Sequence, residues 1–206
     1  MKLPATLGLV VLVALVASGI RPHDRGTWVM EVAPIVIAAP VLVATHRRFP
    51  LTGLLCIVIA LHALVLIFGG AYTYARVPLG DWIASWLALD RNPYDRIGHF
   101  MQGLTPALVA REIFIRTGAV AGRRMRTFLC ICVALAVSAS YELIEWWAAL
   151  ALGQAAEAFL GTQGDVWDTQ ADMFAALIGS IVGLALLSGV QDAQIRARQV
   201  RPAGSR

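Results

Sequence analysis

Acidic side chains and one histidine lie inside the last three apolar segments of this 206-residue chain. An ionisable residue near the centre of a bilayer costs about 2.5–3.5 kcal/mol on insertion scales, so such residues usually face a partner, a cavity or a ligand. Within each segment they are spaced by three or four residues, which places them on one helix face. They are His99 and Gln102 in the first segment, Glu142 and Glu145 in the second, and Asp168 and Asp172 in the third.

Carboxylate oxygens together with an imidazole nitrogen are suitable ligands for a divalent cation such as Zn²⁺, Mn²⁺ or Fe²⁺. The sequence therefore predicts a divalent metal cofactor held between three helices. A bound ion of this kind polarises an ester or phosphoryl group and activates water, with a spare carboxylate as general base. The candidate ligands are His99, Glu142, Glu145, Asp168 and Asp172, and the candidate catalytic groups are Glu142 and Glu145.

Other polar residues near these segments have simpler interpretations. Asp95 and Asp165 fit helix N-caps at the rim of the cluster, where the helix dipole favours a negative charge. Gln102 is expected beside His99, behind the ligands. Glu31 lies one turn inside the outer end of an earlier apolar segment and could join the cluster, but it has no supporting pattern. His62 fits a packing or hydrogen-bonding role.

Six long apolar runs are available to hold these side chains. The chain is 58% hydrophobic and 15% charged, with a mean hydropathy of +0.69, and about 20 apolar residues cross a bilayer as a helix. We expect an all-α transmembrane bundle that fills residues 1–190, followed by a basic tail over 191–206. The first run also fits a cleaved signal peptide, but its length and the short loop after it favour a retained span. The predicted spans are 3–20, 27–45, 51–70, 95–115, 127–150 and 168–189.

The basic residues indicate the orientation and exclude one class of partner. The net charge of +4 does not point to nucleic acid, because the basic residues lie in short connections between apolar runs. If the N-terminus is cytoplasmic, twelve of the seventeen Lys and Arg residues fall on the inner side, as the positive-inside rule requires. Both termini are then cytoplasmic, and the Arg-rich tail lies near anionic lipid. All tryptophans and tyrosines, together with the acidic cluster, fall on the outer side.

Two further patterns concern packing around the cluster. The stretch 81–89 has apolar residues at helical spacing and is too short to span, so we expect a helix in the outer interface. This helix either roofs the site or serves as an ordinary anchor. In the last span a stripe of small residues predicts close helix packing, which turns the acidic face into the bundle. The stripe is Ala171, Ala175, Gly179 and Gly183.

Several short motifs resemble the YjdF-like family of bacterial inner-membrane proteins. They are GAYTY at 70–74, PLG at 78–80, RNPYDRIGHF at 91–100, REI at 111–113, YELIEW at 141–146 and GDVWDTQADM at 164–173. The likeness covers residues 50–190 and implies a multi-pass protein of the bacterial inner (plasma) membrane, without assigning an activity. The last span is also distantly similar to VanZ-like proteins, in which acids precede a helix of small residues.

Three functions fit these observations. The first is a metal-dependent membrane hydrolase that acts on a lipid or cell-envelope substrate at the outer leaflet. The second is a cation or proton-coupled transporter, although the mostly apolar inner halves of the last three spans argue against a continuous path. The third is a non-catalytic membrane component whose acids serve helix association or partner docking. The sequence gives no substrate, metal identity or oligomeric state.

Overall fold

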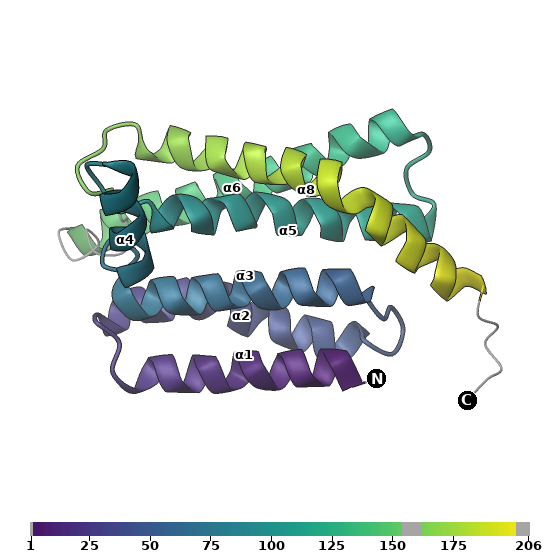
Figure 1. Ribbon diagram of the computed structural model, residues 1–206, viewed down its shortest axis with the longest axis horizontal. Coiled ribbons are helices and arrows are strands. Elements are labelled where there is room, and N and C mark those ends of the chain that lie inside the picture. Colours follow the sequence, from purple (N-terminus) through teal and green to yellow (C-terminus); the bar gives the residue numbers. More distant parts are fainter. Residues whose placement is uncertain (1, 154–161, 201–206) are drawn as a thin grey trace.

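The computed structural model describes residues 2–153 and 162–200, and in these ranges the chain is helical and has no strand. Figure 1 shows the long helices running side by side along one axis. This arrangement confirms the expected all-α bundle. The helices are α1 (Lys2–Ile20), α2 (Arg25–Thr45), α3 (Gly53–Tyr72), α4 (Pro78–Leu87), α5 (Tyr94–Thr117), α6 (Arg123–Leu152) and α8 (Asp168–Val200).

Local capping explains where several helices begin and end. The Asp24 carboxylate accepts the backbone N–H of Thr27 at 2.7 Å and so caps the start of α2. This hydrogen bond also lowers the pKa of Asp24 from its ordinary value. α3 ends at Thr73 and α5 at Gly118, both in the left-handed conformation that commonly terminates a helix.

Five of the described helices are long and apolar enough to cross a membrane: α1, α2, α3, α6 and α8. α5 has 24 residues but is more polar, and it packs against α3, α6 and α8 in the middle of the bundle. Protein neighbours therefore cover the polar face of α5. Together these six helices correspond to the six expected spans, with ends that shift by a few residues.

The largest boundary difference is at the end of α8, which continues to Val200 although the last span was expected to stop at Gly189. Residues 191–200, expected as the start of the tail, thus prolong the helix. Gln191 is fully buried and donates its amide to the Leu108 carbonyl at 2.9 Å. Arg198 donates to the Leu51 carbonyl at 2.6 Å. These contacts hold the extension against α5 and the start of α3.

The closest helix pair is α5 with α8, whose backbones approach through glycine. A Cβ on Gly103 would overlap the carbonyl oxygen of Ala176, and one on Gly179 would overlap the carbonyl oxygen of Phe100. Gly179 and Gly183 belong to the predicted small-residue stripe, and both face α5. The stripe therefore does what its pattern indicated: it brings α8 against α5 and fixes which residues of the two helices meet.

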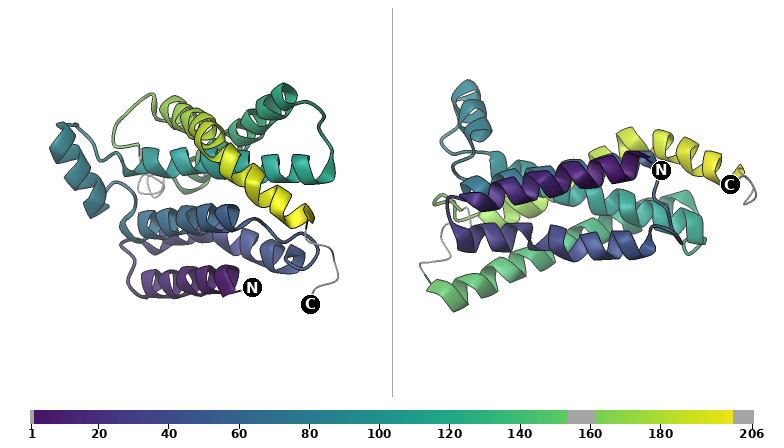
Figure 2. Two further views of the ribbon diagram at one scale, coloured as in Figure 1. Left: turned by 45° about the vertical axis from the view of Figure 1, so that its right-hand side comes forward. Right: turned by 90° about the horizontal axis from the view of Figure 1, so that it is seen from below.

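The first and last described helices and the short helix α4 mark opposite ends of the bundle. Figure 1 places the start of α1 and the end of α8 on the right and α4 on the left, roughly perpendicular to the long helices. Figure 2 shows α4 projecting from the bundle in two further views. Its Trp82 and Trp86 are 64% and 75% exposed and stack on each other. The expected short outer helix is present, and we call the α4 side the outer end and the opposite side the inner end.

A buried polar network ties three helices together at the inner end. Glu112 on α5 is fully buried and accepts hydrogen bonds from the Thr52 backbone at 2.9 Å and from the Thr52 hydroxyl at 2.6 Å. Arg116 donates to the same carboxylate at 2.9 Å, and Arg111 pairs with Asp192 on α8 at 2.6 Å. Each charge in this network has an opposite partner, so we interpret the network as structural.

Candidate functional site

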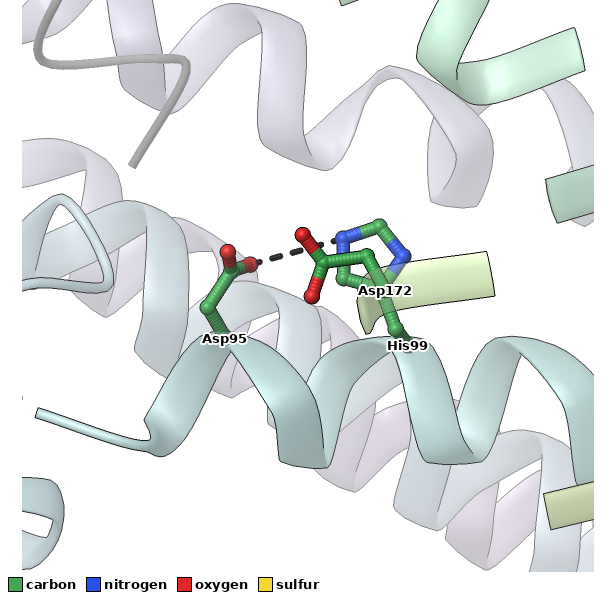
Figure 3. A group of neighbouring side chains, drawn as sticks. All are labelled: Asp95, His99 and Asp172. Carbon is green, nitrogen blue, oxygen red and sulfur yellow. Dashed lines mark ion pairs between the residues drawn. The ribbon is translucent and has the colours of Figure 1, made fainter. Parts of the chain in front are cut away.

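His99 stands at the centre of the outer-end polar cluster, one turn inside α5. Its Nε2 lies 3.5 Å from Asp95 Oδ1 on the preceding turn, the ion pair drawn in Figure 3. Its Nδ1 lies 3.0 Å from the Gln102 side-chain oxygen and 3.7 Å from Glu142 Oε1 on α6. The imidazole is 5% exposed. Gln102 is thus beside His99, as the spacing of three residues predicted.

Two overlapping sets of side chains around His99 have the geometry for a metal ion. One is Asp95, His99 and Asp172, and the other is His99, Glu142 and Glu145; within each set the ligand atoms lie within 4.8 Å of one another. Figure 3 shows Asp172, from α8, turned toward the Asp95–His99 pair on α5. α5, α6 and α8 therefore contribute candidate ligands to one place. The predicted ligands His99, Glu142, Glu145 and Asp172 are brought together there.

Asp168, the remaining predicted ligand, has a different environment. It is 6% exposed and belongs to neither set. Arg91 donates to its carboxylate at 2.7 Å and Arg96 at 3.3 Å. Arg96 also reaches Asp172, with Nε 2.9 Å from Oδ1. Two guanidinium groups thus occupy the carboxylate of Asp168, which we place beside the metal-binding sets.

The two residues interpreted as helix caps also have other roles. The N-cap of α5 is Pro93, and Asp95 is 8% exposed and paired with His99, so the cap interpretation of Asp95 is wrong. Asp165 lies in the loop before α8, where it accepts the Trp167 backbone N–H at 2.9 Å and pairs with Arg91 and Arg96. The Trp167 hydrogen bond and these guanidinium groups lower the pKa of Asp165. It shapes the loop and does not cap the helix itself.

Glu31 lies at the site although the sequence pattern did not place it among the candidate ligands. It comes from α2, is 4% exposed, and accepts a hydrogen bond from the Tyr141 hydroxyl at 3.3 Å. A small cavity of about 20 Å³ lies between Glu31, Asp95, His99 and Glu145. About 10–15 Å³ is enough for one water, so one small ligand fits. The only indication in the sequence was that an acidic residue inside an apolar span is energetically costly. No neighbouring polar residue at helical spacing supported it.

Carboxyl groups outnumber basic groups in this described part of the outer end. Arg91 and Arg96 form ion pairs with Asp165, Asp168 and Asp172. Among the described residues, the His99 imidazole forms ion pairs with two of the remaining acids, Asp95 and Glu142. Buried carboxylates at this density repel one another unless protons or a cation compensate them. The carboxyl groups are Glu31, Asp95, Glu142, Glu145, Asp165, Asp168 and Asp172.

Comparison with known proteins agrees with this description of a multi-pass membrane protein. The family model described as predicted membrane protein (DUF2238) matches residues 3–193. The chain is 56% identical over 191 residues to the inner membrane protein YjdF of Escherichia coli (strain K12), covering 93% of this chain and 91% of that protein. No solved structure matches, and the comparisons do not show the distant VanZ-like similarity. The chain therefore belongs to the DUF2238 family of predicted membrane proteins and is a relative of the inner membrane protein YjdF.

Proposed function

We propose that this inner-membrane protein binds a divalent cation at its outer end, with His99 as the central ligand. Asp95 and Asp172 would complete one coordination set, and Glu142 and Glu145 the other. Oxygen ligands with one imidazole suit Zn²⁺, Mn²⁺ or Fe²⁺. This ligand set differs from the one predicted from the sequence, because it includes Asp95 and omits Asp168.

The observation that carries this proposal is the uncompensated acidic charge around His99. Asp165 and Asp168 already have the guanidinium groups of Arg91 and Arg96. Glu142 Oε1 is buried without a hydrogen-bond partner among the described residues, and its ion pair with His99 Nδ1 is long, at 3.7 Å. Asp172 Oδ1 has only the half-exposed Arg96, whose Nε lies at 2.9 Å. A buried anionic oxygen without a partner is unfavourable, and a bound cation removes that penalty for several carboxylates at once.

Hydrolysis of a lipid or cell-envelope substrate is the reaction that this site would support. A metal with one open coordination position activates water, and a carboxylate outside the coordination set accepts the proton. Glu145 is the candidate base, because it is less buried than Glu142 and lines the cavity beside His99. This role applies when Asp95, His99 and Asp172 hold the ion, because Glu145 is then outside the coordination set. The polarised group would be an ester or a phosphoryl group.

Cation transport is a second candidate, supported by polar groups deeper in the bundle. The hydroxyls of Thr105 and Ser138 are buried without a hydrogen-bond partner among the described residues. Ser138 lies one helical turn inward from Glu142. At this depth and further inward, however, Leu104, Leu108 and Leu55 belong to an apolar cluster. A transport path would have to open this cluster, so we rank transport below a fixed cation site.

Metal analysis of the detergent-purified protein tests the proposal. We expect bound Zn, Mn or Fe, and thermal stabilisation when the same ion is added to metal-stripped protein. An ion at a hundred times its Kd contributes about 2.7 kcal/mol, which corresponds to a rise of about 5–10 °C in Tm for a chain of this size.

Variants separate the cation site from its surroundings. Asp172→Asn and His99→Ala should lose the metal and the stabilisation, whereas Asp165→Asn should keep both, because Asp165 lies in the loop with the arginines. A folded, metal-free protein that no added divalent ion stabilises would refute the proposal. Ion flux in proteoliposomes that Glu142→Gln abolishes would instead favour transport.

A further inference from the structure

An apolar groove runs along α6 directly below the cation site. It has a volume of about 410 Å³ and is lined by Val133, Ala136, Val137, Ser140, Tyr141 and Ile144. From the first to the last of these residues the helix rises about 17 Å. Ser140 and Tyr141 are the two lining residues with a hydroxyl group. The Ser140 hydroxyl donates to the Ala136 carbonyl of its own helix at 2.7 Å. The surface of the groove is therefore almost entirely apolar.

The groove and the site share a wall. Tyr141 lines the apolar groove and also the small polar cavity that contains His99 and Glu145. Its hydroxyl donates to Glu31 on α2 at 3.3 Å. Among the described helices, α2 and α6 are not a closely packed pair. The Tyr141–Glu31 hydrogen bond thus joins the two helices at the point where groove and cavity meet.

We propose that the groove seats the acyl chain of an outer-leaflet phospholipid whose phosphate reaches the cation site past Tyr141. α6 is a membrane-spanning helix, so the groove opens toward lipid. A bound divalent cation supplies the positive charge that an anionic phosphate requires, and in this respect the inference rests on the proposed function. The apolar groove and the charged site then match the two halves of one amphiphile. The substrate of the site is accordingly a phospholipid that enters sideways from the bilayer.

The Tyr141–Glu31 hydrogen bond controls this entry. While it is made, the phenol ring stands between the groove and His99, and α2 stays joined to α6. Tyr141→Phe removes the hydroxyl and keeps the ring. Headgroup access should then rise by about fivefold, the equivalent of one ordinary hydrogen bond.

Photo-crosslinking in nanodiscs tests the lipid seat. The probe is phosphatidylglycerol with a diazirine in one acyl chain, added as a minor component to phosphatidylcholine. We expect α6 peptides covering 133–144 to be labelled several-fold more than the exposed part of α8 around Ala185. Ala136→Trp fills the groove and should reduce this labelling to the α8 level. Ala185→Trp makes the same change on a lipid-facing position outside the groove and should leave the labelling intact.

Cation binding is measured on the same samples as a check of folding and of the site. Ala136→Trp should retain the cation, and if it does not fold, Ala136→Leu fills the groove less severely. Uniform labelling of α6 and α8 with the cation still bound would overturn the lipid inference and leave the proposed function standing. Groove labelling in a protein that binds no divalent ion would overturn the proposed function and the phosphate contact together.

A second copy of the chain is the competing occupant of this groove. An Ala136→Cys variant tests for it under oxidising conditions. Disulfide-linked dimers above the level formed by the unaltered chain would identify the groove as an interface between copies and overturn the lipid assignment. Monomers only, together with groove labelling, are the expected result.

Discussion

At the scale of single residues, Arg96 competes with a bound cation for the carboxylate of Asp172. Its guanidinium contacts Asp165, Asp168 and Asp172, at 3.1, 3.3 and 2.9 Å. Arg96→Gln should lower the stability of the metal-free protein by about 2 kcal/mol, because buried Asp172 loses its arginine partner while Asp168 keeps only Arg91. The same variant should gain more stability from an added divalent ion, because Asp172 becomes available as a ligand.

Thermal unfolding with and without Mn²⁺ measures both effects in one series. The stability of Arg96→Lys and its gain from Mn²⁺ should lie between those of Arg96→Gln and the unaltered protein. An ammonium group keeps the charge but cannot contact several carboxylates at once as a guanidinium does. Arg76→Gln is the matched control, since Arg76 is an exposed arginine of the same outer end. If Arg96→Gln lost the stabilisation by Mn²⁺, Arg96 would be needed to assemble the site. Arg96 and the cation would then not compete for Asp172.

At the scale of elements, the contact between α5 and α8 decides whether His99 meets Asp172. Gly103→Ala or Gly179→Ala should destabilise the protein by about 1–3 kcal/mol, because the added methyl group meets backbone that cannot move aside. Gly189→Ala in the same helix has open space and should be neutral or stabilise by about 0.5–1 kcal/mol. Melting temperatures in detergent compare the three variants. Equal effects at positions 179 and 189 would contradict the close approach.

At the scale of the whole molecule, the orientation of the bundle determines which compartment the site faces. The start of α1 and the end of α8 lie at the inner end, opposite α4, and the inner end holds most of the lysines and arginines of the described chain. By the positive-inside rule, a cysteine replacing Asp90 should react with a membrane-impermeant maleimide from the periplasmic side. A cysteine replacing Ala121 should react only after the inner membrane is opened. The native cysteines lie within helices and are buried or half-buried, so they form the background. The reverse labelling pattern would place the site in the cytoplasm.

Much of this arrangement follows from local sequence patterns. Long apolar runs, separated by short connections with proline, glycine or charge, predicted the six long helices within a few residues, except at the end of α8. Spacings of three and four residues predicted the faces that carry His99, Glu142, Glu145 and Asp172. The small-residue stripe predicted that α8 packs closely. These features depend on neighbours within about two helical turns, which a single sequence displays directly.

Features that depend on distant partners were not predictable in the same way. Arg91 and Arg96 meet Asp165 and Asp168 only because the loop before α8 folds back across the end of α5. Glu31 joins the site because α2 lies beside α3, and an isolated acid shows no periodicity that would indicate this. The extension of α8 depends on Gln191, whose partners are about eighty residues away in the chain.

The polar face of α5 has a consequence for biosynthesis. α5 is not among the described helices that are apolar enough to enter a bilayer on their own, and it carries Asp95, His99, Arg111 and Glu112. A translocon releases such a segment into lipid only when neighbouring segments cover its charges. The helices that cover it most, α6 and α8, are made after it. Integration of α5 is therefore expected to wait for the C-terminal third of the chain, and the site is assembled during that final step of insertion.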